Sequence, residues 1–302
     1  MKTKISVYIT SYNQKDYLKK AIESVLNQTL RPDEILIIDD GSTDGSRELI
    51  KDYSRNHPKL IHYHFNEKNL GISKTRNKAL SLLSGDYVTF VDGDDMFYKD
   101  KILLESKALA GNPETDIVFS DYDMINEEGV ITKNWRLENF NNDLFERSYT
   151  FRWPERSPFR SPMIKLNKWR EIGFYDESLE IFEDLDMMLR LSKKLSCTHV
   201  KESLTQYRRH QQGISNQKLD QIIRILEYIY SKNESLLKNI DKKDKQSLIK
   251  KKNKFINNLY LLRIYKEKSN VNYLKTIIDL LSLLSKEPVL IFRNVTFLII
   301  KP

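Results

Sequence analysis

The sequence comprises 302 residues, of which 50 are basic, 42 are acidic and 40% are hydrophobic. This length and apolar content suit one large α/β domain with a helical addition, and they exclude an intrinsically disordered chain. The one cysteine, Cys197, excludes an intrachain disulfide and a thiol-rich zinc site. A chain with a single cysteine suits a reducing compartment, so we expect a cytoplasmic protein.

The positive charge is concentrated towards the C-terminus. Residues 215–302 contain 18 Lys and Arg against 8 Asp and Glu, a net charge of +10, whereas residues 1–214 contain 32 against 34, a net charge of −2. This uneven distribution disfavours a nucleic-acid-binding protein. The apolar stretches at 5–9 and 288–300 are shorter than the roughly 20 residues of a membrane span, so we expect none.

Strand-like and helix-like segments alternate over the first 120 residues. Strands are predicted at residues 5–9, 35–38, 60–65 and 87–91. Helices are predicted at residues 16–28, from about 43 to 53, 72–83 and 98–110. Continuous apolar strands separated by helices indicate a parallel sheet covered on both faces, which is a Rossmann-like arrangement.

The pattern changes after residue 116. A strand at 117–119 precedes a segment, 126–162, that is irregular, aromatic and rich in arginine, and we assign this segment to the acceptor side. Helical patterns follow at 182–195 and from about residue 215, and a strand is predicted between them at 196–200. We therefore predict a catalytic domain at 1–214, with a donor half at about 1–120 and an acceptor half at about 121–214, and a basic helical region at 215–302.

Oxygen-bearing side chains follow three of the predicted strands, at residues 10–13, 39–42 and 92–95. Because the carboxyl ends of parallel strands meet at one edge of a sheet, we expect these side chains to lie close together. Crowded carboxylates repel one another unless a cation or hydrogen-bond donors compensate them. Oxygen ligands favour Mg²⁺ or Mn²⁺. For Asp39 and Asp44, capping of the next helix is the alternative interpretation.

Taken in order, five motifs resemble the series found in glycosyltransferase family 2. They are Thr10-Ser11-Tyr12-Asn13, Asp39-Asp40-Gly41-Ser42-Thr43-Asp44, Asn69-Leu70-Gly71-Ile72-Ser73-Lys74-Thr75-Arg76-Asn77, Asp92-Gly93-Asp94-Asp95 and Glu183-Asp184-Leu185-Asp186. The resemblance extends over roughly residues 3–213. It implies a GT-A fold, in which a mostly parallel Rossmann-like sheet has helices on both faces, here followed by an all-helical C-terminal extension. It also implies an inverting transfer of a sugar from a nucleotide diphosphate donor.

The same resemblance implies a set of donor-binding residues. Thr10, Tyr12 and Asp40 would hold the base and the ribose. Asp92 would reach the ribose. Arg76 would lie near the edge of the uracil or near the neighbouring carboxylates, and a structural ion pair with Asp40 or Asp92 is its alternative interpretation.

By resemblance, Asp94 would bind Mn²⁺ or Mg²⁺, with Asp95 as a rival ligand. The cation would act as a Lewis acid on the nucleoside diphosphate that leaves. Arg208, Arg209 and His210 would add hydrogen-bond donors to the phosphates. A surface basic cluster is the alternative interpretation of this loop.

The acceptor hydroxyl needs a base on the face opposite the leaving group. Glu183 and Asp184 stand at the start of a predicted helix, and by resemblance Asp184 is the base. Glu183 and Asp186 would orient it or bind acceptor hydroxyls. We predict that Trp153 stacks on an acceptor sugar, whereas Trp169 is predicted to pack in the interior.

These features predict an inverting, metal-dependent glycosyltransferase that moves a hexosyl or N-acetylhexosaminyl group from a UDP-sugar to a hydroxyl of a saccharide or lipid-linked saccharide. The expected setting is the assembly of a bacterial surface polysaccharide, such as a capsule. A catalytically inactive GT-A scaffold that binds nucleotide or saccharide is one alternative. A nucleotidyltransferase is another, disfavoured because residues 10–13 contain no glycine.

The apolar and basic segment 270–302 has its own prediction. We expect it to pack on the catalytic domain or to form a homodimer. Peripheral contact with the inner face of the cell membrane is the alternative, because a basic amphipathic helix can bind an anionic bilayer.

Overall fold

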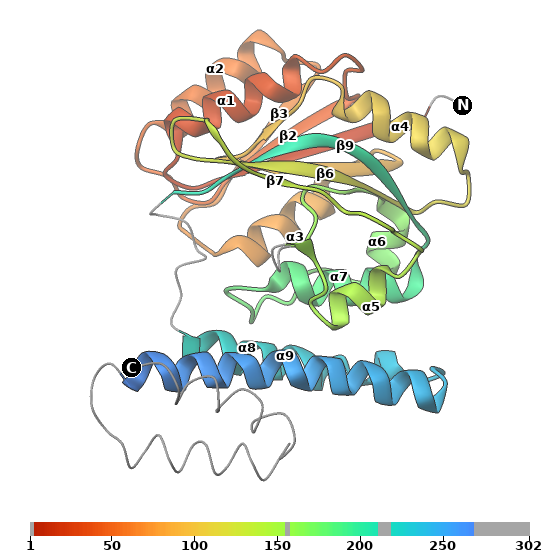
Figure 1. Ribbon diagram of the computed structural model, residues 1–302. Helices are drawn as coiled ribbons and strands as arrows, with labels where there is room; N and C mark the ends of the chain where they lie inside the picture. Colours follow the sequence, from red (N-terminus) through yellow and green to blue (C-terminus); the bar gives the residue numbers. More distant parts are fainter. Residues whose placement is uncertain (1–2, 155–157, 211–218, 269–302) are drawn as a thin grey trace. The chain divides into compact units, whose positions relative to one another are not determined.

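The computed structural model describes residues 3–154, 158–210 and 219–268 (Figure 1). The chain separates into two compact units. The first, which we call the sheet unit, consists of residues 1–148 and 152–216, and the second, the helical unit, consists of 149–151 and 217–302. All five motifs lie in the sheet unit.

Four parallel strands form one half of the sheet. Their spatial order is β3 (Ile61–Phe65), β2 (Glu34–Asp39), β1 (Ile5–Ser11) and β4 (Tyr87–Asp92). Strand β1 is buried at all its positions, as expected for a central parallel strand with both faces covered. The predicted mostly parallel α/β sheet is therefore confirmed for this half.

The other half of the sheet mixes parallel and antiparallel pairs. It runs from β4 through β8 (Met163–Lys165), β6 (Ile117–Ile125) and β9 (Cys197–Arg208) to β5 (Met96–Phe97). Strand β8 is antiparallel to both β4 and β6, whereas β6 and β9 are parallel. Strand β7 (Ile131–Trp135) pairs with β6 as a hairpin.

Helices cover both faces of the sheet (Figure 1). One face carries α1 (Lys15–Leu26), α2 (Ser46–Asn56) and α4 (Lys101–Gly111). The other carries α3 (Ile72–Leu82), α5 (Leu144–Tyr149), α6 (Leu166–Ile172) and α7 (Glu183–Lys194). Strand residues alternate between the two cores, with Val7 and Ile9 in one and Tyr8 in the other, because successive side chains point to opposite faces.

The segment 126–162, predicted to be irregular, contains β7 and α5. Strand β9 is also longer than the predicted strand, because its pairing with β6 continues to Arg208. Neighbouring strands supply hydrogen bonds that a local pattern does not reveal.

The helical unit contains α8 (Leu219–Lys232), a short 3₁₀ helix at Glu234–Leu237 and α9 (Lys242–Lys268). The rings of Phe151 and Phe255 stack with their centroids 4.4 Å apart. The Tyr230 hydroxyl donates a hydrogen bond of 2.9 Å to the carbonyl of Tyr149. The segment 270–302 lies outside the described residues, so its packing, dimerisation or membrane contact stays a prediction.

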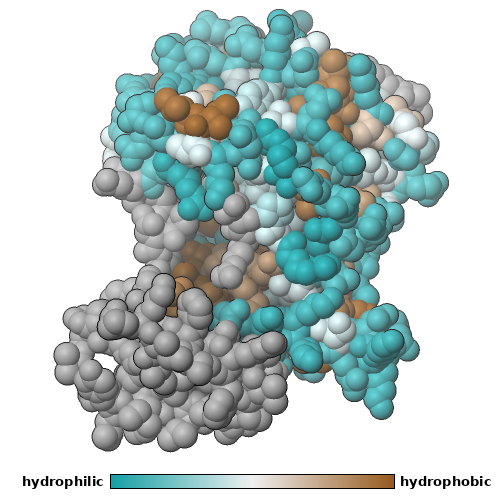
Figure 2. Space-filling model, viewed as in Figure 1, coloured by the Kyte–Doolittle hydropathy of each residue, from teal (hydrophilic) through white to brown (hydrophobic). Residues whose placement is uncertain are grey.

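The surface seen in Figure 2 is largely hydrophilic over the described residues, with a few hydrophobic patches between the polar areas. Within the parts of 3–268 that the structure describes, none of the helices combines the length and apolar character that crossing a bilayer requires.

Candidate active site

The ends of β1 and β4 bring two of the predicted residues together. Thr10 and Asp92 are register partners in this parallel pair. The hydroxyl of Thr10 donates a hydrogen bond of 2.9 Å to Oδ1 of Asp92. The parallel strands thus place the first and fourth motifs at one sheet edge, as the strand-end argument predicts.

Arg76 of α3 joins Asp92 to the start of α7. Its Nη2 lies 2.9 Å from both carboxylate oxygens of Asp92, and its Nη1 lies 2.6 Å from Oε1 of Glu183. Only 7% of the Arg76 side chain is exposed. Burial lowers the pKa of this guanidinium, but Asp92 and Glu183 together raise it well above its ordinary value. Of the interpretations given to Arg76, the structure contains the ion pair with Asp92.

Asp92 itself is an ionised anchor. Burial raises the pKa of its carboxyl, but Arg76, followed by Thr10, more than offsets this effect and holds the pKa below its ordinary value. Both carboxylate oxygens already accept hydrogen bonds from protein groups.

Asp94 and Asp95 carry negative charge that the protein compensates only in part. Nε2 of His210 lies 2.9 Å from Oδ2 of Asp94, and the backbone N–H of Arg208 donates to Oδ1 of Asp95 at 2.8 Å. Burial, and then repulsion from Asp92, raises the pKa of Asp94. Burial, followed by repulsion from Asp94 and Asp92, raises the pKa of Asp95 well above its ordinary value.

These two carboxylates fit a divalent cation. A bound cation would offset the burial and the repulsion that raise their pKa values, and their oxygens are the ligands that Mg²⁺ and Mn²⁺ prefer. In the described residues, no group of three or more His, Cys, Asp or Glu side chains could hold a metal. Because Mg²⁺ sites often use one or two carboxylates plus substrate phosphates, Asp94 and Asp95 suit a cation whose coordination a substrate completes.

Arg208 supports the backbone around Asp94. Its Nε donates to the carbonyl of Asp94 at 2.9 Å, and its Nη1 donates to the carbonyls of Asn126 and Glu127 at 2.7 and 2.8 Å. The residue is buried, with its guanidinium 4.7 Å from the centroid of the Tyr17 ring, and its Nη2 has no hydrogen-bond partner among the described residues. Arg208 therefore fixes the backbone of the Asp94 turn, and its predicted contact with a phosphate stays a prediction. The rest of that basic loop, from residue 211, lies outside the described residues.

The start of α7 presents two acids in different environments. Burial, opposed by Arg76 and reinforced by Asp184, raises the pKa of Glu183 to about 7. Asp184 is more open, with 34% of its side chain exposed. The preceding residue, Phe182, has φ +59°, a left-handed conformation that is costly without glycine and that recurs at functional sites.

One cavity of the sheet unit is lined both by acids from the end of β4 and by an acid of α7. Asp92 and Asp95 line it from the end of β4, Asp184 lines it from α7, and Arg160 lines it from the segment before β8. The rest of its wall is mainly apolar and includes Phe90, Phe159, Trp169, Tyr175, Met187 and Met188. Such a cavity, mainly apolar with a few convergent charged groups, is typical of a small-molecule site.

Arg160 is not among the residues that the motifs predict for the site. Its guanidinium lies 4.0 Å from the centroid of the Tyr207 ring, and its Nη1 lies 3.6 Å from Oδ2 of Asp184. Burial lowers the pKa of this group, but Tyr207, Tyr122 and Asp184 raise it above its ordinary value. The arginine-rich character of the segment was visible in the sequence, but nothing distinguished Arg160 from Arg152 nearby.

Asp40 contacts the loop between β3 and α3. Its Oδ1 accepts hydrogen bonds of 2.8 Å from Asn66 Nδ2 and Leu70 N–H, and its Oδ2 accepts one of 2.9 Å from Gly71 N–H. Asp40 therefore holds this loop, and its predicted contact with a base or ribose stays a prediction. Tyr12, at 45% exposure, is accessible to a ligand.

Trp153 is a core residue, which overturns its prediction as an acceptor platform. Only 6% of it is exposed, and it belongs to the core beneath α3, α6 and α7. Its ring lies 6.2 Å from that of Trp135 and 5.7 Å from that of Phe159, measured between centroids. A ring enclosed in this way has no free face for a sugar. Trp169 is buried too, as predicted.

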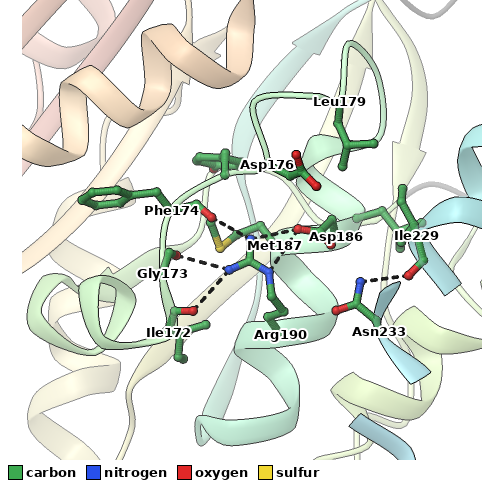
Figure 3. A network of polar contacts seen from close by, with 12 residues as sticks. Ile172, Gly173, Phe174, Asp176, Leu179, Asp186, Met187, Arg190, Ile229 and Asn233 are labelled. Carbon is green, nitrogen blue, oxygen red and sulfur yellow. Dashed lines mark hydrogen bonds and ion pairs between the residues drawn. The ribbon is translucent and has the colours of Figure 1, made fainter. Parts of the chain in front are cut away.

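Asp186 is fully buried and structural, so its predicted contact with the acceptor is also overturned. Arg190 donates to Oδ2 of Asp186 from Nε at 3.0 Å and from Nη2 at 2.9 Å (Figure 3). The same guanidinium donates to the carbonyls of Ile172, Gly173 and Phe174. The pair thus ties α7 to the chain that follows α6.

Comparison with solved structures matches this fold. The structure of S. aureus TarS 1–349 in complex with UDP-GlcNAc superposes with a TM-score of 0.68 at 20% sequence identity, covering 89% of this chain and 76% of that one. The mixed sheet with helices on both faces is therefore a GT-A fold.

Sequence relatives point the same way. An uncharacterized glycosyltransferase of Rickettsia felis is 34% identical over 210 residues, 68% of this chain and 33% of the relative. One of Methanocaldococcus jannaschii is 29% identical over 207 residues, 68% of this chain and 70% of the relative. The alignment thus spans about a third of the Rickettsia protein. Residues 6–169 match the sequence model of glycosyl transferase family 2. The chain belongs to glycosyl transferase family 2.

Proposed function

We propose that this chain is an inverting glycosyltransferase that transfers a sugar from a UDP-sugar to a hydroxyl of a saccharide acceptor. One observation carries the proposal: Asp92 and Asp95 line the same cavity as Asp184. A donor and an acceptor that enter this cavity would meet between a site suited to a cation and an accessible carboxylate.

The donor end would hold the nucleoside diphosphate. Asp94 and Asp95 would bind Mn²⁺ or Mg²⁺, which as a Lewis acid stabilises the negative charge on the leaving diphosphate. His210 keeps Asp94 in place, and Arg76 and Thr10 keep Asp92 ionised and oriented for the ribose. The exposed ring of Tyr12 is available to the base.

At the acceptor end, Asp184 would accept the proton of the attacking hydroxyl. Its side chain lines the cavity and is partly exposed, whereas Glu183 is engaged with Arg76. Attack from this side, opposite the leaving diphosphate, would invert the configuration at the anomeric carbon.

We propose the assembly of a bacterial surface polysaccharide as the setting, with a hexosyl or N-acetylhexosaminyl donor. The names of two relatives support this setting. A chondroitin synthase of Escherichia coli is 29% identical over 216 residues, 72% of this chain and 30% of the relative. A putative teichuronic acid biosynthesis glycosyltransferase of Bacillus subtilis is 38% identical over 128 residues, 42% of this chain and 49% of the relative.

The test is the activity of Asp94→Asn and Asp184→Asn with a panel of UDP-sugars, Mn²⁺ and saccharide acceptors. Each substitution should lower the rate of transfer by about 100-fold or more, because it removes a cation ligand or the general base. Glu180→Gln, which changes an exposed acid just before α7, is the matched control and should retain activity.

Circular dichroism would establish that the variants are folded. Full activity in both aspartate variants would overturn the proposal. Binding of UDP by the wild-type protein without turnover of any donor would instead indicate a nucleotide-binding scaffold.

A further inference from the structure

We infer that Arg76 is a positioning residue, which fixes the distance and orientation between the donor-side carboxylate Asp92 and the base Asp184 by holding Asp92 and Glu183 at once. The inference rests on the proposed function, because it concerns the alignment of donor and base in that reaction. It assigns Arg76 no direct contact with the substrate.

The contacts of Arg76 join three separate elements. The guanidinium comes from α3, Asp92 from the end of β4 and Glu183 from the first turn of α7, 107 residues further along the chain. Its Nη2 contacts both oxygens of Asp92, and its Nη1 contacts Oε1 of Glu183. Charge-assisted bonds from one planar group fix the relative orientation of both partners.

The same geometry leaves little of the guanidinium for a nucleobase. Both terminal nitrogens are engaged, and Nε is buried. The rings of Phe90 and Tyr175 lie near the group, with centroids 5.3 and 5.6 Å from its central carbon. A uracil edge would have to displace Asp92 or Glu183 to reach Arg76.

The position of Asp184 follows from that of Glu183. The two are adjacent, and the preceding Phe182 is in a left-handed conformation, so the entry to α7 is a constrained turn. Holding Glu183 therefore sets the direction in which Asp184 enters the cavity. A displacement of about 1 Å in a catalytic group can cost about 100-fold in rate.

Lysine cannot replace Arg76 in this arrangement. An ammonium group is a point charge and lacks the planar fork that reaches both oxygens of Asp92 and also Glu183. In the full-length protein, Arg76→Lys should lower kcat by about 10- to 100-fold. Its Kd for UDP should stay within about threefold, and its preference for UDP over CDP and ADP should not change, because Asp92 keeps a positive partner.

The measurements are kcat and KM for donor and acceptor, and calorimetric Kd values for UDP, CDP and ADP. Arg190→Lys is the matched control, since Arg190 is a partly buried arginine that pairs with an acid of α7 and also contacts carbonyls. Its kcat, measured below the unfolding temperature, should stay within about threefold of that of the wild type.

A second variant keeps the inference testable if Arg76→Lys does not fold. Glu183→Gln preserves the shape of the side chain but removes its charge, and should lower kcat by about tenfold with little change in the Kd of UDP. Where both variants fold, their combined effect on log kcat should be smaller than the sum of the separate effects, because both act through one contact.

Three results would overturn the inference: unchanged kcat in either variant, additive effects in the double variant, or a changed preference among UDP, CDP and ADP. The last result would assign Arg76 to base recognition. If the wild-type protein neither binds UDP nor transfers a sugar, the proposed function itself fails, which is a distinct outcome.

Discussion

At the scale of single residues, the buried acids of the site differ in how far positive charge compensates them. Asp92 is well compensated by Arg76, which holds its pKa down, whereas burial and repulsion raise the pKa values of Asp94 and Asp95. The pKa of Glu183 is also raised, because Arg76 offsets only part of the effect of burial. The structure thus distinguishes an anchoring carboxylate from carboxylates suited to a cation.

The raised pKa of Glu183 predicts a pH-dependent stability. Its pKa is about 7 in the folded protein against 4.5 ordinarily, so the folded state binds the proton more tightly. The stabilisation from that proton is fully present below about pH 4.5 and is lost as the pH rises through about 7. Relative to Glu183→Gln, the unfolding free energy of the wild type should fall by up to about 3 kcal/mol between these values.

Urea unfolding at a series of pH values measures this difference, with the exposed Glu180→Gln as a control that should show no such trend. A difference between wild type and Glu183→Gln that is constant with pH would contradict the prediction.

Two residues that were predicted to contact the acceptor turn out to be structural. Asp186 pairs with Arg190, and Trp153 is enclosed by other rings. A motif identifies a carboxylate or a guanidinium but not its partners. Those partners come from segments remote in sequence, as with Asn126 and Arg208.

At the scale of elements, the turn after β2 and the loop between β3 and α3 are built together. Gly41 has φ +86°, and its α-carbon faces the loop so closely that an added Cβ would lie 2.6 Å from Asn69 N and Lys68 C. Asp40 holds the same loop through Leu70 and Gly71. The second and third motifs therefore form one structural unit.

Two glycine substitutions distinguish the free-energy cost of a steric clash from the cost of a positive φ. Gly41→Ala should lower the unfolding free energy by about 3 kcal/mol or more, because it adds a backbone clash to the cost of a positive φ. Gly71→Ala, with φ +89° and no heavy atom within 4 Å of its added Cβ, should cost only about 1–2 kcal/mol.

Chemical denaturation of both variants tests this contrast, and the Kd for UDP should weaken only in Gly41→Ala, where the loop must move. Equal destabilisation by the two substitutions would argue against the close packing.

At the scale of the whole molecule, the chain forms two compact units with different compositions. The sheet unit has two cores, one on each face of the sheet. The helical unit is built around α8 and α9 and includes residues 149–151 from the middle of the chain. We propose that catalysis belongs to the sheet unit, because all lining residues of the cavity lie in it.

Because the chain divides into two compact units, we expect two separable unfolding transitions in thermal or urea denaturation. Phe255→Ala removes the stack with Phe151 and should shift the transition of the helical unit. Ile37→Ala changes the core of the sheet unit and should shift the transition of that unit. Each shift should correspond to about 3 kcal/mol.

Calorimetry with far-ultraviolet circular dichroism would resolve the two steps. One cooperative transition that both substitutions shift equally would show that the units unfold together.

The family, the parallel half of the sheet and the strand ends at which the acidic motifs lie could all be predicted from the sequence. The family follows from the resemblance of five motifs, and the strands follow from hydrophobic periodicity, which is a local property of the chain. The approach of Thr10 to Asp92 followed from them, since parallel neighbours share an edge.

Which polar side chains line the cavity depends on the tertiary structure. Arg160 lines it, whereas Arg208 bonds to backbone carbonyls and Asp40 bonds to the loop before α3, although all three were equally polar in the sequence. Burial and the identity of partners depend on contacts between distant segments. A local pattern does not encode these contacts, and they alone set the charge and the access of each group.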